Sequence, residues 1–315
     1  MLILGACTTK DIPLDAQPTL LQISPIPTST NPSPTTPTHT PTPQGAAPSS
    51  STHTPGAQTK TLTPQATPPS PTQLACWEES GRIEQAQINS ELLPKPLDVR
   101  VYLPPCYDQE TTRRYPVLYL IHGQSYNDDQ WDRLGVDETA DSLIASGELP
   151  PFLIVMPRDY ACCTQPDQDK FGEAFVQELI PWVDQNYRSL TERQFRAIGG
   201  LSRGAGWAVH IGLSRWELFG AIGGHSLPIF WVDTSSIKKW LDAIPEGQFP
   251  RFYLDNPEND RPEILKSSLW FESLLTKRGI PHEWHRFKGY HEEKYWLAHI
   301  EQYLRWYAEE WKSGD

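Results

Sequence analysis

A β-strand pattern that passes directly into a helical pattern constrains the fold of this chain more than any other feature. Residues 195–200 read as a short strand, and residues 203–213 follow with the periodicity of an amphipathic helix. The two patterns meet at Gly200-Leu201-Ser202-Arg203-Gly204. Glycines at both ends of this segment permit a tight, strained turn that raises the serine hydroxyl above the sheet. We therefore expect Ser202 to lie between a sheet strand and a helix.

The distribution of aromatic residues indicates which part of the chain can build such a sheet. No Phe, Trp or Tyr precedes Trp77, and 15 of the 31 prolines lie between Pro13 and Pro71, mixed with Thr, Ser, Gln and Ala. A segment with so few large apolar side chains cannot bury enough surface to offset its ordering entropy. The composition therefore predicts a disordered Thr/Pro-rich linker over residues 8–75 and a single folded domain over residues 76–315.

Charge and hydropathy exclude two classes of partner. The formal net charge is −12, and the basic and acidic residues of positions 1–75 cancel, so the folded domain carries all of it. An acidic domain is a poor candidate for binding nucleic acid. No run of 18 apolar residues occurs, which argues against an ordinary transmembrane helix.

The first residues resemble the end of a bacterial lipoprotein signal. Leu4-Gly5-Ala6-Cys7 fits the lipobox, in which small residues precede the cysteine that becomes lipidated. We expect residues 1–7 to be the remnant of such a signal, with membrane contact only through a lipid anchor at Cys7. The protein would then be an extracytoplasmic surface lipoprotein. The alternative is that Cys7 is an ordinary residue of a flexible tail.

The remaining cysteines agree with an oxidising compartment. Cys76 and Cys106 flank two expected strands joined by a turn at residues 92–96, and a hairpin there would bring the two cysteines together. The sequence therefore predicts a disulfide between them. Cys162 and Cys163 are adjacent, and we assign them no role.

The rest of the folded domain alternates β-rich runs with amphipathic segments, which is typical of a mostly parallel sheet covered by helices. The predicted strands are 84–90, 97–103, 115–121, 152–157, 195–200, 219–224, 251–255 and 282–287. The predicted helices are 136–146, 170–186, 203–213, 262–278 and 292–312. A short turn makes the first two strands antiparallel. Segment 225–250 is long enough to be an insertion that shapes a substrate site. The fold class we predict is α/β, namely an α/β-hydrolase fold with about eight mostly parallel strands and helices on both faces.

A serine nucleophile needs a neighbouring base, which a carboxylate in turn orients. In the expected fold the chain order is serine, acid, histidine. His291 follows Gly289 and Tyr290 at the end of the last predicted strand, where a base would reach over the sheet. The other late histidines, His282, His285 and His299, lie in or beside a strand or helix. We therefore predict that His291 is the base.

Asp260 is the predicted acid, because it follows strand 251–255 and precedes the helix that begins near Pro262. It could also be the N-cap of that helix. Asp255 and Glu258 are the alternatives for the acid.

Two backbone N–H groups should stabilise the negative charge that develops on a substrate carbonyl oxygen. One is that of Arg203, directly after the serine. The other is that of Gln124, in the loop after strand 115–121, where we expect His122 to be structural.

Several segments together resemble the Putative esterase family, over about residues 80–312. They are Val101-Tyr-Leu-Pro-Pro105, Leu118-Tyr-Leu-Ile-His-Gly123, Gly200-Leu-Ser-Arg-Gly204, Asp260 and Gly289-Tyr-His291. The family includes esterase D (S-formylglutathione hydrolase), enterochelin esterase, feruloyl and acetylxylan esterases, and the antigen 85 mycolyltransferases.

The resemblance implies acyl transfer by an esterase domain over residues 76–315. Ser202 would attack an ester carbonyl, His291 would shuttle the proton, and water would release the acyl group. No metal or cofactor is implied, and the sequence contains neither a His-x-x-x-His pair nor paired Cys-x-x-Cys motifs. Two departures from the family pattern are Pro257, where the acid loop usually has glycine, and Tyr290, where the histidine loop often has a second glycine.

Aromatic residues near the expected site suit aromatic acyl groups and sugar rings. The candidates for the substrate pocket are Tyr126, Trp131, Tyr160, Trp207, Phe230, Trp231 and Tyr290. We expect a small-molecule or polysaccharide-linked ester, such as a feruloylated or acetylated polysaccharide or a siderophore ester. The alternatives are an acyltransferase with the same triad and a catalytically inactive binding module displayed at the surface.

Overall fold

The computed structural model describes residues 77–161 and 163–313. The predictions for Cys7 and for the linker over residues 8–75 therefore lie outside the described residues. So does the prediction of a Cys76–Cys106 disulfide, because Cys76 is not among them.

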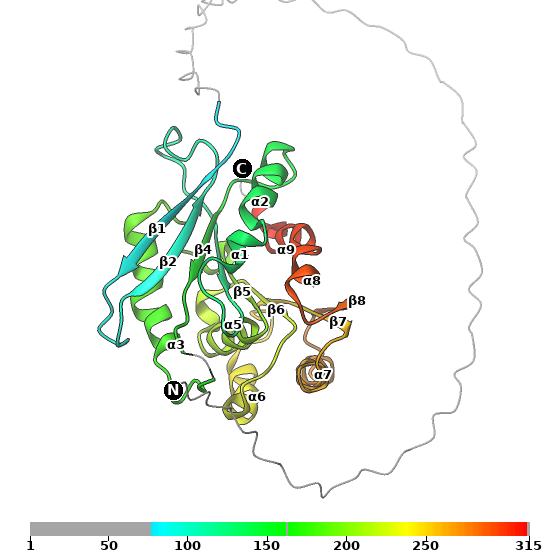
Figure 1. Ribbon diagram of the computed structural model, residues 1–315. Helices are drawn as coiled ribbons and strands as arrows, with labels where there is room; N and C mark the ends of the chain where they lie inside the picture. The colour runs from blue at the N-terminus through cyan, green and yellow to red at the C-terminus, as the bar shows by residue number, and fades with distance from the viewer. Residues whose placement is uncertain (1–76, 162, 314–315) are drawn as a thin grey trace, which may run out of the picture. The chain divides into compact units, whose positions relative to one another are not determined.

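Eight strands form one sheet in the order β1-β2-β4-β3-β5-β6-β7-β8 (Figure 1). The strands are β1 Arg82–Ile88, β2 Leu97–Leu103, β3 Val117–Ile121, β4 Leu153–Pro157, β5 Arg196–Leu201, β6 Ala221–His225, β7 Arg251–Asn259 and β8 Glu283–Tyr290.

The sheet is antiparallel only at its first edge. β1 pairs antiparallel with β2, and β2 pairs antiparallel with β4. All other neighbouring strands are parallel. Each predicted strand is present, so the predicted fold class is confirmed.

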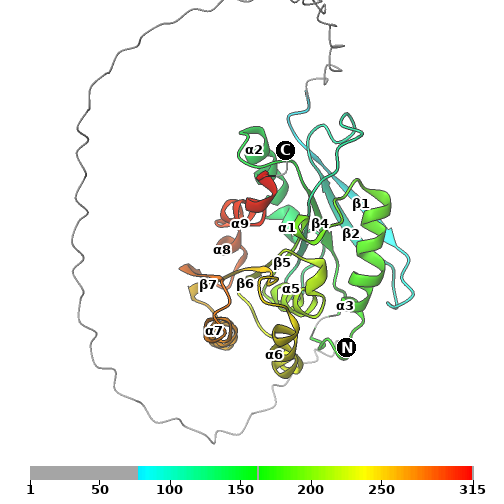
Figure 2. The same ribbon diagram turned by 180° about the vertical axis from the view of Figure 1, so that it is seen from behind.

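Helices occupy the connections between the strands from β3 onward, and two further helices follow β8 (Figures 1 and 2). They are α1 Gln130–Arg133, α2 Val136–Ala145, α3 Phe171–Ala174, α4 Ile180–Asn186, α5 Arg203–Ser214, α6 Thr234–Ala243, α7 Pro262–Lys277, α8 Glu293–Leu297 and α9 Ile300–Tyr307. The sequence did not predict α1 or α6, and α6 lies within the expected insertion at residues 225–250. A π-helical turn at Phe175–Leu179 joins α3 to α4, where one continuous helix was predicted. The predicted last helix is divided into α8 and α9.

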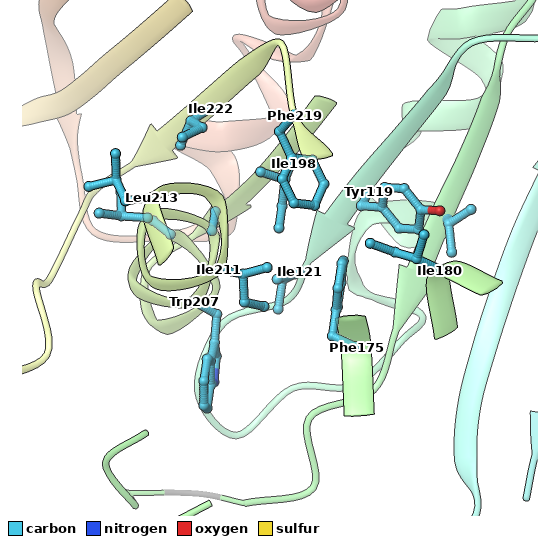
Figure 3. Close-up of a cluster of buried hydrophobic side chains, with 14 of the residues drawn as sticks. Tyr119, Ile121, Phe175, Ile180, Ile198, Trp207, Ile211, Leu213, Phe219 and Ile222 are labelled. Carbon is cyan, nitrogen blue, oxygen red and sulfur yellow. The ribbon is translucent and has the colours of Figure 1, made fainter. Parts of the chain in front are cut away.

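The core lies on both faces of the sheet, because successive side chains of a strand point to opposite sides. On β3, Val117, Tyr119 and Ile121 belong to one buried cluster, whereas Leu118 and Leu120 belong to another. Figure 3 shows the first cluster, in which Tyr119 and Ile121 lie near side chains of α5 and of the 175–180 segment. The second cluster contains side chains from α2 and α9. This two-sided burial explains why β3 and β4 are apolar at every position.

The last two strands are longer than predicted, and this difference brings two loops together. β7 continues to Asn259, with an irregularity in its pairing to β8 between Pro257 and Asn259. β6 pairs with β7 only as far as Asp255, so no residue of β6 lies opposite Pro257. Proline, which has no backbone N–H to donate, is therefore tolerated at this position. Asn259 pairs with Tyr290, and the next residues of the chain, Asp260 and His291, are therefore neighbours.

Among the described residues, no helix is long and apolar enough to cross a bilayer.

Candidate active site

Ser202 lies at the strand-to-helix turn that the sequence predicts. It follows β5 directly, precedes α5, and has φ 51° and ψ −124°, a conformation that is strained for a non-glycine residue. A Cβ atom on Gly200 would lie 2.3 Å from the Gly204 carbonyl carbon, and one on Gly204 would lie 2.1 Å from the Ile121 oxygen. Both positions therefore require glycine. The tight turn that these glycines allow places Ser202 at the carboxyl edge of the sheet.

His291 bonds to two groups through its two ring nitrogens. Its Nε2 lies 2.9 Å from the Ser202 Oγ, and its Nδ1 lies 2.7 Å from the Asp260 Oδ1. The His291 side chain is 7 % exposed, and the Trp296 ring packs edge-on against it with 5.0 Å between ring centroids. The structure thus brings together the three side chains that were predicted from the sequence. Ser202 and Asp260 are 58 residues apart in the chain, and Asp260 and His291 are 31 residues apart.

Asp260 is held from three directions. Besides its contact with His291, its Oδ1 accepts a hydrogen bond from the Arg261 N–H at 2.7 Å, and its Oδ2 accepts one from the Asn256 side-chain amide at 2.6 Å. The side chain is fully buried. The N-cap of α7 is Arg261 and not Asp260, which corrects the second role considered for this aspartate.

The alternative acids lie elsewhere. The Asp255 Oδ1 is 2.6 Å from the His225 Nδ1, and its Oδ2 accepts hydrogen bonds from the hydroxyls of Tyr295 and Tyr303. This is a fully buried network within the core. Glu258 is exposed near the end of β7. The hydrogen bonds of the His291 ring go to Asp260 and Ser202, and not to either of these carboxylates.

The two residues that carry the predicted backbone donors line the cavity that contains Ser202. Arg203 is the first residue of α5, so its N–H has no acceptor within the helix. Gln124 lies in the exposed loop after β3. The cavity has a volume of about 300 Å³. Its lining includes Gln124, Tyr126, Ser202, Arg203, His291 and Trp296, with Arg261, Glu263 and Glu292 among its charged residues.

The predicted pocket residues fall into three groups. Tyr126 lines the Ser202 cavity, and Tyr160 lines a smaller neighbouring cavity of about 110 Å³. Three other rings are buried in the core and do not line the Ser202 cavity, namely Trp131, Trp207 and Phe230. Their placement differs from the prediction because other groups cover them: Trp207, for example, packs between Phe171 and Phe230. Trp231 and Tyr290 are 71 % and 61 % exposed, and they also lie outside the lining of this cavity.

Three residues of the site were not predicted from the sequence. Trp296 packs on the base, Asn256 holds the acid, and Arg261 borders the cavity. No local motif marks them: Trp296 lies in α8, Asn256 within β7 and Arg261 at the start of α7, and each acquires its role only from where the fold places it. No group of three or more His, Cys, Asp or Glu side chains that could hold a metal ion occurs among residues 77–161 and 163–313.

A mostly parallel eight-stranded sheet with a strained serine between a strand and a helix defines the α/β-hydrolase fold. Solved structures agree with this class. A ferulic acid esterase is 24 % identical with a TM-score of 0.65, covering 74 % of this chain and 99 % of that one. The feruloyl esterase module from Clostridium thermocellum is 19 % identical with a TM-score of 0.63, covering 77 % of this chain and 94 % of that one.

Residues 90–307, more than half of the chain, match the family described as Putative esterase, and the chain belongs to this family. An endo-1,4-beta-xylanase/feruloyl esterase of Xylanibacter ruminicola is 31 % identical over 219 residues, which is 64 % of this chain and 29 % of that protein. An esterase of Mycobacterium tuberculosis is 27 % identical over 244 residues, which is 61 % of this chain and 52 % of that protein. The matched region therefore spans about half or less of these relatives.

Proposed function

We propose that the protein is a serine carboxylic ester hydrolase in which Ser202, His291 and Asp260 form the catalytic triad. The observation that carries this proposal is the double contact of His291, at 2.9 Å to the Ser202 Oγ and at 2.7 Å to the Asp260 carboxylate. A carboxylate on Nδ1 keeps the ring proton there and leaves Nε2 free to accept the serine proton. Membership of the Putative esterase family supports the same reaction.

The reaction follows from this geometry. The Ser202 Oγ attacks the ester carbonyl carbon while His291 Nε2 takes the hydroxyl proton. The carbonyl oxygen becomes negative and accepts hydrogen bonds from the N–H groups of Gln124 and Arg203. His291 then gives its proton to the leaving alcohol, and an acyl-enzyme remains. Water, deprotonated by the same Nε2, releases the carboxylic acid and restores Ser202.

The cavities suggest where the two halves of the ester lie. Gln124, Tyr126 and Arg203 line both the 300 Å³ cavity and the 110 Å³ cavity, whereas His291 lines only the larger one. The leaving alcohol must lie near the histidine that protonates it. We therefore place the alcohol in the larger cavity and the acyl group toward Tyr160 in the smaller one.

The substrate we favour is an extracellular ester, such as a feruloylated or acetylated polysaccharide, with a siderophore ester as a further candidate. The similarity to a relative named as a xylanase and feruloyl esterase supports an ester linked to a polysaccharide. The partly exposed rings of Tyr126 and Tyr160 offer surfaces on which an aromatic acyl group or a sugar could pack.

The test is hydrolysis of a panel of esters by the full chain: p-nitrophenyl acetate, p-nitrophenyl butyrate, methyl ferulate and acetylated xylan. Ser202→Ala and His291→Ala should each lower kcat/KM by about 1,000-fold or more. Matched controls are Ser226→Ala, a buried serine that also has positive φ, and His285→Ala, a histidine that also lies beside a carboxylate. Both controls should retain activity. A folded wild-type protein that is inert on every ester would refute the proposal.

A further inference from the structure

Asp159 lies in the loop after β4 and contacts both backbone segments that carry the proposed oxyanion donors. It is 7 % exposed, and its side chain is 3 % exposed. Its backbone bonds to the loop that contains Gln124, and its carboxylate bonds to the side chain of Arg203. The reaction proposed above does not use this carboxylate chemically.

The first contact runs through His122. The Asp159 N–H donates to the His122 Nε2 at 2.9 Å, so the ring proton must be on Nδ1. Nδ1 then donates to the Gly123 carbonyl oxygen at 2.7 Å. Burial lowers the pKa of His122, which favours this neutral form.

The Gly123 carbonyl belongs to the same peptide unit as the Gln124 N–H. A hydrogen bond to that carbonyl fixes the plane of the peptide. It also polarises the amide, so the Gln124 N–H becomes a better donor. Through His122, the Asp159 backbone therefore fixes the orientation of the peptide that carries the first oxyanion donor.

The second contact runs through the Asp159 carboxylate. Its Oδ2 accepts hydrogen bonds from the Arg203 Nε at 2.9 Å and from the Trp207 indole N–H at 2.8 Å. Its Oδ1 accepts one from the Ala161 N–H at 2.9 Å. The Arg203 guanidinium also donates to the Thr164 carbonyl oxygen at 2.8 Å. The first turn of α5, which begins with the second donor, is therefore fastened to the loop after β4.

We propose that Asp159 is a positioning residue that holds the Gln124 and Arg203 N–H groups at the separation that the transition-state oxygen requires. The inference rests on the proposed hydrolase reaction. The two donors come from loops after different strands, and both must lie 2.7–3.1 Å from one oxygen atom to stabilise its charge. A single buried residue bonded to both loops removes their independent motion.

The test compares Asp159→Asn with the wild-type full chain on the best ester of the panel. Asparagine keeps the shape but loses the charge that faces Arg203, and its amide must face a donor on one side. We expect kcat to fall about 100-fold with KM nearly unchanged, because only the transition state uses the donors fully. Affinity for a trifluoromethyl ketone, which Ser202 converts to an oxyanion adduct, should fall by a similar factor.

Asp184→Asn is the matched control, because Asp184 bonds to the buried Arg196 at 2.9 Å near the start of β5, at the opposite end of that strand from Ser202. It should lower the melting temperature without lowering kcat or ketone affinity. Arg203→Met provides a second variant that keeps the backbone N–H. It should lower kcat like Asp159→Asn, and the double variant should lose little more than either single one.

The outcomes separate this inference from the proposed function. An inert wild-type protein, or a Ser202→Ala variant with full activity, overturns both. A wild-type protein that depends on Ser202, with an Asp159→Asn variant that keeps its kcat and ketone affinity, overturns the inference alone. Equal losses of kcat in Asp159→Asn and Asp184→Asn also overturn it, since they would reflect destabilisation only.

Discussion

Replacement of Asp260 by asparagine tests the proposed triad at its most specific contact. The Asp260 Oδ1 faces the His291 Nδ1 at 2.7 Å and also accepts the Arg261 N–H, while Oδ2 accepts the Asn256 amide. An asparagine has no negative charge to stabilise the protonated His291 ring, and its one acceptor oxygen and one NH₂ group cannot accept from the donors that face both carboxylate oxygens. With NH₂ toward His291, the ring proton moves to Nε2, and Ser202 then faces a donor that cannot take its proton.

The size of the expected effect follows from the general behaviour of such triads. Loss of the correct tautomer in a Ser-His-Asp triad lowers kcat by about 10³- to 10⁴-fold, which corresponds to roughly 4–5.5 kcal/mol of transition-state stabilisation. The Asp260 side chain is fully buried, and asparagine has nearly the same shape as aspartate, so KM should change little. The assay is steady-state hydrolysis of a p-nitrophenyl ester, with circular dichroism to verify folding.

Asp255→Asn and Glu258→Gln are the controls, because the sequence leaves both residues open as acids. Asp255 binds His225 at 2.6 Å in the core, so its replacement should lower the melting temperature more than kcat. Glu258 is exposed, and its replacement should be neutral. An Asp260→Asn variant that keeps a tenth or more of wild-type kcat, beside an Asp255→Asn variant that loses it, would refute the assignment.

Three further predictions concern stability. Gly204→Ala should lower the free energy of unfolding by roughly 3 kcal/mol or more in urea titration, since its Cβ would lie 2.1 Å from a β3 carbonyl oxygen; an unchanged midpoint would contradict the close approach. Tyr307→Phe should cost about 1–3 kcal/mol, because it leaves the buried His225 Nε2 without its hydroxyl partner at 3.0 Å, and a neutral result would mean that this bond contributes nothing. Burial raises the pKa of Asp137 from 3.8 to about 7. Between those pH values the unfolded state loses the proton first, so this carboxyl stabilises the fold below pH 3.8 and its contribution is lost as the pH rises toward 7. Asp137→Asn should therefore match the wild-type melting temperature near pH 4 and exceed it at pH 8, and parallel melting curves across this range would exclude the effect.

Most of the sheet could be predicted from the sequence because its signals are local. Continuous apolar runs mark β3 and β4, which are buried on both faces. The strand-turn-helix segment around Ser202 follows from glycines that no other residue can replace. The short α1 and the insertion helix α6 were missed, since short or weakly apolar helices depend on tertiary packing more than on their own pattern.

The aromatic pocket shows where local reasoning ends. Trp207 and Tyr126 are both aromatic and both near the site in sequence, but one is fully buried and the other is 45 % exposed. Composition does not distinguish a ring that fills the core from a ring that lines a cavity. Only the packing of α5 against its neighbours decided the matter.

The sequence by itself determined the fold class, the serine turn and the candidates for base and acid, because strand periodicity, glycine sterics and chain order are properties of short segments. The tertiary structure decided which carboxylate faces His291. The irregularity in β7 and the pairing of Asn259 with Tyr290 set Asp260 beside that ring, while Asp255 remains in the core with His225. The physical reason is that a hydrogen bond of 2.7 Å depends on the register of two strands, and register is set by contacts across the whole sheet.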